Sequence, residues 1–285
     1  MNAIYDLAIV GAGLSALSAI AAGLAGSADQ QVIIFDYQDA PGGFLRPALP
    51  ASGFEQAWEL IRSFRFPAQI TACFGATAVG LLPALDAGEP HTLLVRRREG
   101  TGEVEARRIL IACGGLEATR ESAQIPGPRP AGVMTPIMAH QLLARGYLPG
   151  RRAIVHGDAL YTRATARRMI GAGMEVTLVT PSEARLVGVE GFPRLERVTF
   201  SRDGQAYHAA ADTLVYGVGM LANTHWLMGS GIELVSDGAI AVDERYQTSI
   251  PGVYAVGTVI APSLDHAASI TMGKEVATLL QGGTA

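Results

Sequence analysis

Two glycines and a carboxylate near the N-terminus have the spacing of a nucleotide-binding unit. Gly11 and Gly13 interrupt an apolar run of residues 6–25, which predicts a strand, a tight turn and a helix. Gly11 permits the turn, Gly13 lets backbone approach a pyrophosphate, and Ala16 takes the place of the third glycine of the fingerprint. Leu14 and Ser15 fall at the start of the helix, where unpaired backbone N–H groups favour an anion.

A second apolar run, residues 31–36, ends in the carboxylate Asp36, which is followed directly by Tyr37. An acid at the end of the second strand of a βαβ unit binds a ribose hydroxyl. A G-x-G-x-x-A turn alone is weak evidence, because such turns also serve strand–helix packing in proteins that bind nothing. The strand before the turn, the helix after it and the acid on the next strand together favour nucleotide binding.

Composition narrows the class of protein. The chain has 285 residues, of which 49% are hydrophobic and 17% are charged, which suits a globular α/β protein of about two domains. A net charge of −4 gives no electrostatic footprint for nucleic acid. Residues 7–28 carry no charge, but no Lys or Arg precedes them and two glycines interrupt them, so we expect neither a signal peptide nor a transmembrane segment. The expected location is therefore the cytoplasm.

The chain offers no obvious catalytic group. Its two cysteines, Cys73 and Cys113, form no C-x-x-C pair, so neither a redox dithiol nor a cysteine metal site is expected, and no other metal site stands out. Four further candidates, scattered without catalytic spacing, are His140, His156, His208 and His225. We therefore assign no catalytic residue from the sequence.

Two glycine-rich segments give the first resemblance to a known family. The loop of residues 39–47, with Gly42 and Gly43, is similar to a Pro-Gly-Gly loop of two-dinucleotide-binding-domain flavoproteins, in which it lies along the FAD. An ordinary surface turn is the alternative. Residues 109–115, which end at Gly114 and Gly115, resemble the "ATG" strand at which the FAD domain of these proteins gives way to the second domain.

Residues 120–135 and 146–152 carry the most specific resemblance, reading R-E-x-x-x-x-I-P-G-x-R-P-A-G-V-x-T and G-Y-L-P-G-R-R. They resemble a branch of the FAD-dependent pyridine nucleotide–disulfide oxidoreductase superfamily that includes the alpha subunits of opine oxidases, heteromeric proline dehydrogenases and hydrogen cyanide synthase. In that branch the reductase-like chain works beside a second flavoprotein subunit. The resemblance implies such a partner here, with the small-molecule substrate on the partner.

The second nucleotide unit departs from the family pattern. Where the family has G-x-G-x-x-G, this chain has Gly157, Ala159 and Thr162, and Asp158 adds negative charge beside the expected phosphate. The following strand ends at Thr180 rather than at an acid for NAD, and too few residues follow for the family's next helix and strand. This pattern predicts a shortened domain that binds phosphate poorly.

Residues 243–257 resemble the family motif T-S-x-P-G-V-Y-A-x-G-D, with Gly257 in place and Thr258 where the aspartate binds the ribityl chain. A threonine hydroxyl can still hydrogen-bond a ribityl hydroxyl. The resemblance also implies that a helix over residues 265–280 points its N-terminal end at the flavin. Asp265 and His266, at that end, are therefore candidate cofactor-binding residues. The alternative roles are an N-cap aspartate and a surface histidine.

Together these patterns predict an α/β protein of two Rossmann-like domains, the second inserted in the first and shortened. We expect residues 1–117 and 222–285 to bind FAD and residues 118–221 to form a degenerate NAD(P)-like domain. The expected function is electron transfer within a heteromeric complex with an amine- or hydroxy-acid-oxidising flavoprotein. A stand-alone NAD(P)H-dependent reductase and a non-catalytic nucleotide-binding subunit are the alternatives.

Overall fold

The computed structural model describes residues 3–27 and 29–281, and the chain folds into two compact units. Unit 1 contains the chain up to Arg46, Phe54–Leu116 and the chain from Met220 onward. Unit 2 contains Glu117–Gly219 together with the short segment Pro47–Gly53. The second unit is therefore inserted in the sequence of the first, as the fold class required.

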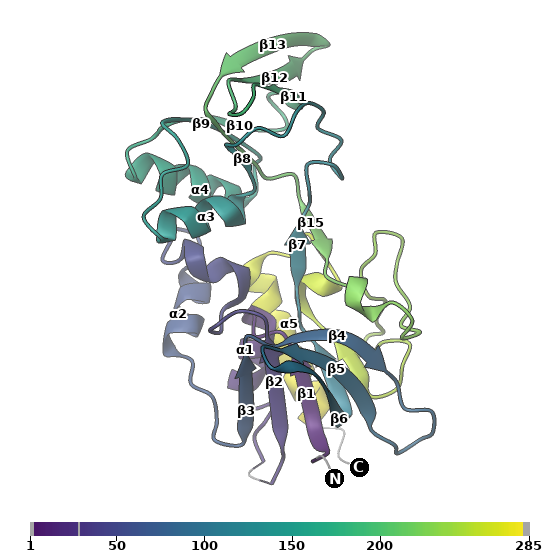
Figure 1. Cartoon of the computed structure of the whole chain (residues 1–285). Helices are drawn as coiled ribbons and strands as arrows, with labels where there is room; N and C mark the ends of the chain where they lie inside the picture. The colour runs from purple at the N-terminus through teal and green to yellow at the C-terminus, as the bar shows by residue number, and fades with distance from the viewer. Residues whose placement is uncertain (1–2, 28, 282–285) are drawn as a thin grey trace. The chain divides into compact units, whose positions relative to one another are not determined.

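A seven-stranded sheet forms the centre of unit 1 (Figure 1). Its strand order is β3-β2-β1-β6-β5-β4, and β16 also pairs with β6. The parallel strands are β1 (Tyr5–Val10), β2 (Val32–Asp36), β3 (Ile70–Phe74), β6 (Gly100–Ile111) and β16 (Val253–Ala255). The antiparallel strands are β5 (His91–Arg97) and β4 (Thr77–Leu82). Because parallel strands end at one edge, residues that follow β1, β2, β6 and β16 gather there.

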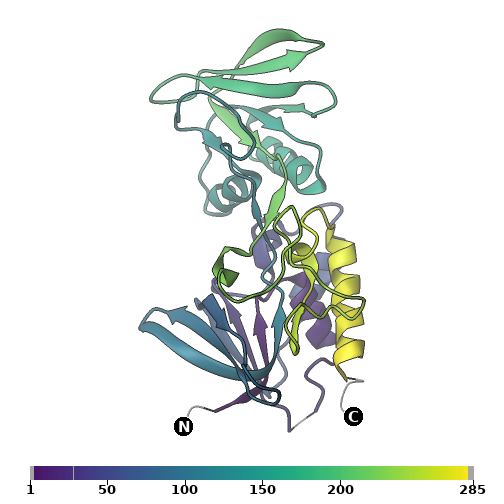
Figure 2. The ribbon, with the colours of Figure 1, turned by 90° about the vertical axis from the view of Figure 1, so that its right-hand side faces the viewer.

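Helices α1 (Leu14–Ala21) and α5 (His266–Gln281) lie side by side in unit 1, where α5 is the long yellow helix of Figure 2. A third helix, α2, covers Glu55–Ser63. Alternate residues of β1 enter two cores, with Leu7 and Ile9 on the side of α1 and α5. A Cβ on Gly273 of α5 would lie only 2.2 Å from the carbonyl oxygen of Ser15, so glycine permits the close packing of these helices.

Unit 2 is a three-layer sandwich. Its central parallel sheet has the order β10-β9-β14-β8, from β8 (Val133–Met134), β9 (Arg152–His156), β10 (Glu175–Val179) and β14 (Thr213–Tyr216). Helices α3 (Pro136–Ala144) and α4 (Leu160–Gly171) cover one face. The antiparallel strands β11 (Arg185–Glu190), β12 (Arg197–Arg202) and β13 (Gln205–Ala210) cover the other face (Figure 1). In this described stretch no helix stands between β10 and the hairpin of β12 and β13, as predicted, but the strand β11 does, because it pairs with β12.

The remaining elements are short. Strands β7 (Gly115–Glu117) and β15 (Met220–Ala222) pair with one another. Three 3-10 turns occupy Gly43–Ala48, His225–Leu227 and Gly257–Val259. Among the described residues, no helix is both long enough and apolar enough to cross a bilayer.

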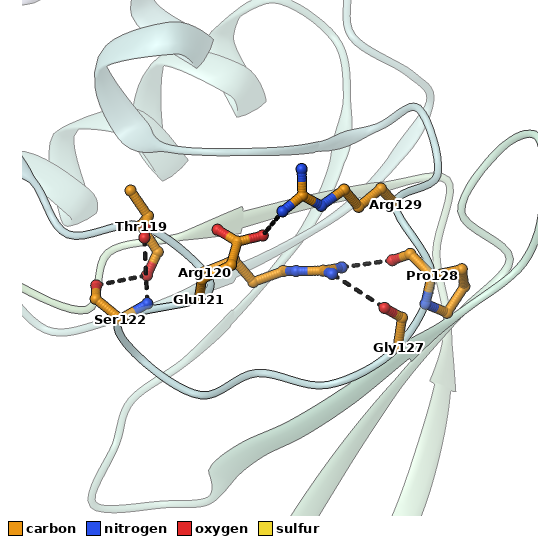
Figure 3. A network of polar contacts seen from close by, with 7 residues as sticks. All are labelled: Thr119, Arg120, Glu121, Ser122, Gly127, Pro128 and Arg129. Atoms are coloured by element: carbon orange, nitrogen blue, oxygen red, sulfur yellow. Dashed lines mark hydrogen bonds and ion pairs between the residues drawn. The ribbon is translucent and has the colours of Figure 1, made fainter.

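The proline-rich crossover of residues 119–129 is an ordered loop folded around one arginine (Figure 3). Arg120 is only 8% exposed, and its guanidinium donates to the carbonyl oxygens of Gly127 and Pro128. An exposed ion pair of 2.7 Å joins Arg129 to Glu121 across the same loop. The five guanidinium donors of an arginine suit the capture of several carbonyls, which explains how a glycine- and proline-rich segment keeps one conformation.

Candidate functional site

The glycine turn of unit 1 presents open backbone at the end of β1. Gly11 has a φ of +99°, and a Cβ there would lie 2.4 Å from the carbonyl oxygen of Ala112, so only glycine fits. A Cβ on Gly13, by contrast, would meet no heavy atom within 4 Å. The helical hydrogen bonds of α1 begin at Leu17, whose N–H donates to the carbonyl oxygen of Gly13. The N–H groups of Leu14, Ser15 and Ala16 therefore remain as helix-end donors for an anion.

Asp36, the last residue of β2, also stabilises the glycine turn through its side chain. The side chain is 8% exposed, and Oδ2 accepts a hydrogen bond of 2.7 Å from the N–H of Ala12. Oδ1 accepts one of 2.8 Å from the N–H of Gln38. Each carboxylate oxygen keeps a second lone pair for a ribose hydroxyl. Tyr37, the next residue, is 64% exposed and lies at the rim of this position.

The Pro-Gly-Gly loop lies directly against the glycine turn. The N–H of Gly42 donates to the carbonyl oxygen of Ala12 at 2.8 Å. A Cβ on Gly43 would lie 3.3 Å from the Cα of Gly13. The structure thus brings this loop to the predicted pyrophosphate position.

Two further segments meet at the same edge of the sheet. A Cβ on Gly114, just after β6, would lie 3.3 Å from the hydroxyl of Thr258, and one on Gly257 would lie 2.5 Å from the hydroxyl of Ser15. Gly257 and Thr258, which follow β16, therefore lie between the turn and the end of β6. Together these residues form a cradle of the kind that an extended dinucleotide requires.

The start of α5 has a structural explanation as well. Oδ1 of Asp265 accepts a 2.7 Å hydrogen bond from the N–H of Ala268, so Asp265 is the N-cap of α5, which begins at His266. The His266 ring packs against Phe54 with 4.8 Å between ring centroids. Both residues therefore have a structural role at the start of α5.

No catalytic constellation emerges among the described residues, which also contain no group of three or more metal-ligating side chains. Burial raises the pKa of Cys113 to about 12, so this thiol stays protonated and unreactive. Burial, aided by the nearby Arg168 charge, lowers the pKa of His140 to about 4. His156 uses Nδ1 to contact the carbonyl oxygen of Val179 at 3.1 Å, and burial lowers its pKa. These groups are structural.

The corresponding turn in unit 2 is filled rather than open. Gly157 keeps a positive φ of +136°, but Ala159 is the N-cap of α4 and places a methyl group where Gly13 leaves open space. Thr162 is 2% exposed, and a Cβ on Gly217 would lie 2.2 Å from the Thr162 hydroxyl. The threonine therefore packs onto the neighbouring strand end. Asp158 is exposed at the turn.

The end of β10 is occupied by a residue that the sequence pattern did not reveal. Oε2 of Glu183 accepts hydrogen bonds from the N–H of Thr180 at 2.8 Å and from its hydroxyl at 2.9 Å. The hydrogen bond from the Thr180 backbone holds the Glu183 pKa below its usual value. The T-x-x-E spacing of Thr180 and Glu183 is the sequence signal for this contact, since it is the spacing of a capping box. An acid thus follows β10, but its carboxylate is hydrogen-bonded to Thr180 at the end of that strand.

Comparisons with known proteins agree with this geometry. The family model described as pyridine nucleotide-disulphide oxidoreductase matches residues 184–273. The soluble pyridine nucleotide transhydrogenase of Enterobacter sp. (strain 638) is 26% identical over 209 residues, which are 63% of this chain and 43% of that protein. The soluble pyridine nucleotide transhydrogenase of Salmonella typhimurium is 27% identical over 209 residues, with the same coverage of both chains. The chain thus spans less than half the length of these relatives.

Solved structures share the whole fold. L-proline dehydrogenase from P. horikoshii has a TM-score of 0.78 at 20% identity, covering 99% of this chain and 56% of that one. Thioredoxin reductase from T. acidophilum has a TM-score of 0.72 at 18% identity, covering 98% of both chains. The family-model match over residues 184–273 and the likeness of the fold support the predicted FAD-dependent pyridine nucleotide–disulphide oxidoreductase superfamily. The predicted α/β fold of two Rossmann-like units is thereby confirmed, and the same comparisons support the predicted FAD cofactor and oxidoreductase class.

Proposed function

We propose that this chain is the FAD-carrying electron-transfer subunit of a heteromeric oxidoreductase, whose second flavoprotein subunit oxidises a small amine or hydroxy acid. Its own flavin is not reduced directly by NADH or NADPH. The observation that carries the proposal is the filled nucleotide turn of unit 2, described above. The fold likeness to L-proline dehydrogenase and the resemblance of residues 120–152 to subunits of such complexes support the partner.

In unit 1 the cradle residues have complementary tasks toward FAD. Gly11, Gly13 and Leu14 offer backbone to the pyrophosphate, Asp36 accepts from the adenosine ribose, and Thr258 bonds the ribityl chain. FAD supplies the two-electron chemistry when bound, and the positive end of α5 favours negative charge on the flavin. Nothing in this arrangement requires a titrating side chain of the chain itself.

In unit 2 three features oppose a nicotinamide nucleotide. The methyl group of Ala159 blocks close approach to the turn, Asp158 repels phosphate, and Glu183 is held by Thr180 instead of facing a ribose. Each feature costs on the order of 1 kcal/mol, and every 1.4 kcal/mol is about tenfold in affinity. Jointly they reduce affinity by about a hundredfold relative to an open turn.

The test is anaerobic stopped-flow mixing of the FAD-loaded chain with NADH and with NADPH. We expect no rapid bleaching of the flavin absorbance, whereas dithionite bleaches it fully and so controls for a reducible cofactor. The double variant Asp158→Ser with Ala159→Gly should bind NADPH more tightly than the unaltered chain. Rapid bleaching of the unaltered chain by either nucleotide would overturn the proposal.

Two other functions differ in measurable ways. The likeness to soluble transhydrogenases favours a stand-alone NAD(P)H-dependent reductase, which the same stopped-flow experiment would reveal. A non-catalytic subunit would keep its flavin oxidised while substrate reduces the partner's flavin in the assembled complex. Co-purification from the native source would identify that partner, and cell fractionation would test the predicted cytoplasmic location.

A further inference from the structure

One segment of unit 2 comes from the middle of the sequence of unit 1. Pro47–Gly53, here called the linking segment, belongs to unit 2, although Arg46 and Phe54 on either side of it belong to unit 1. The chain therefore passes from one unit to the other inside the 3-10 turn Gly43–Ala48. The linking segment thus joins the two units a second time, apart from the insertion of Glu117–Gly219.

Helix α4 holds the linking segment at both of its ends. Nη1 of the half-buried Arg168, in the last turn of α4, donates a hydrogen bond to the carbonyl oxygen of Pro47. A Cβ on Gly53 would lie 3.0 Å from Cδ1 of Leu160, the first residue of α4, so this leucine side chain packs directly on the glycine. Since a helix rises 1.5 Å per residue, the two contacts are about 12 Å apart along α4. The linking segment therefore spans most of this helix.

In unit 1 the residues next to the linking segment belong to the FAD cradle or pack beside it. Before the segment, a Cβ on Gly43 would lie 3.3 Å from the Cα of Gly13 in the glycine turn. After it, Phe54 is 3% exposed and packs on the His266 ring at the start of α5. Because Gly43 and Pro47 lie in the same 3-10 turn, fixing Pro47 restricts the Pro-Gly-Gly loop as well.

Arg168 is the side chain that fixes Pro47. A hydrogen bond from a guanidinium is stronger than one from a neutral donor. In the described part of the chain Arg168 forms no ion pair that would compete with the Pro47 carbonyl. Arg167, the preceding residue of α4, is exposed instead.

We propose that Arg168 is a positioning residue for FAD, which acts by holding Pro47 on α4 and so keeps the Pro-Gly-Gly loop in contact with the glycine turn. Without this hydrogen bond the loop has more conformations to give up when FAD binds, and the lost entropy lowers the affinity. Because such coupling is reciprocal, bound FAD also strengthens the attachment of the linking segment to α4. The inference rests on FAD binding by unit 1 and does not depend on the proposed electron transfer.

The first test is fluorescence titration of the flavin-free full chain with FAD. The unaltered chain is titrated first, so that a failure of the cradle assignment is distinguished from a failure of the coupling. Arg168→Gln should weaken FAD binding about fivefold or more, the lower end of the usual coupling between sites. Arg167→Gln removes the same charge from the exposed neighbour and should leave the affinity unchanged. Arg168→Lys keeps a cationic donor and should lose less affinity than Arg168→Gln.

Hydrogen exchange separates positioning from a general loss of stability. In the unaltered chain, FAD should slow exchange of the amides of the linking segment but not of strands β12 and β13, which lie elsewhere in unit 2. Leu160→Ala removes the packing at the other end of the segment and should also weaken FAD binding, so it decides the question should Arg168→Gln fail to fold by circular dichroism. The proposal is overturned by unchanged FAD affinity in Arg168→Gln, by equal losses in the two glutamine variants, or by exchange in the linking segment that FAD leaves unaltered.

Discussion

Replacing Asp36 by alanine should lower the stability of the flavin-free protein as well as its affinity for FAD. The N–H of Ala12 is buried and donates to Asp36 at 2.7 Å, so the variant leaves a buried donor without its acceptor, at a cost of about 1–3 kcal/mol. The N–H of Gln38 is only partly buried and can turn to water, which adds about 1 kcal/mol. The total of about 2–4 kcal/mol corresponds to a fall of roughly 5–10 °C in Tm.

The assay compares thermal unfolding of the flavin-free variant and the unaltered protein by circular dichroism, followed by fluorescence titration with FAD. Asp39→Ala is the matched control, because it removes the same charge from a side chain that is 86% exposed and pairs with Arg46. Such a surface pair contributes about 0–1 kcal/mol. Unchanged melting of flavin-free Asp36→Ala, together with weaker FAD binding, would refute the inference that Asp36 holds the turn.

Three further predictions concern packing, pH and chemistry. Gly273→Ala should destabilise the protein by about 1–3 kcal/mol in urea titrations, because its Cβ would collide with Ser15, whereas Gly171→Ala has open space and should be nearly neutral. The pKa of His140 falls from 6.5 in the unfolded chain to about 4 in the folded chain. The free energy of unfolding should therefore fall by about 2 kcal/mol from pH 7 to pH 5, because the unfolded chain takes up the proton first. In urea titrations at these two pH values, His140→Leu should remove that loss. Lacking a C-x-x-C pair, the chain should show no NADPH-dependent disulfide turnover in a thiol-release assay, and measurable turnover would contradict the inference that Cys73 and Cys113 form no redox dithiol.

Local signals were sufficient for the first βαβ unit and for the β12–β13 hairpin. The turn at Gly11 and Gly13 is specified by backbone freedom within a few residues of the strand that leads into it. Asp203 and Gly204 form an Asp-Gly pair, which is typical of a two-residue hairpin turn, and both have positive φ, at 51° and 79°. A positive φ at both central residues is the geometry that a two-residue hairpin turn favours.

Other features depend on contacts that no local pattern encodes. Strand β3 was not predicted, because its five residues lack a clean alternation and gain their partner only from β2. Gly100 and Gly102 have the composition of a turn, yet they begin β6, since pairing with β5 extends that strand to Gly100. The hydrogen bonds of Glu183 to Thr180 became visible only with the side chains in place.

The sequence by itself determined the open glycine turn with its acid, the altered second turn at Ala159 and Thr162, and the lack of a dithiol, because each depends on residue types at short spacing. Only the tertiary structure decided that Gly114 and Thr258 meet beside that first turn, although they are far apart in the chain. The physical reason is sheet pairing: β6 pairs with β1 and with β16, so segments distant in sequence end at one edge.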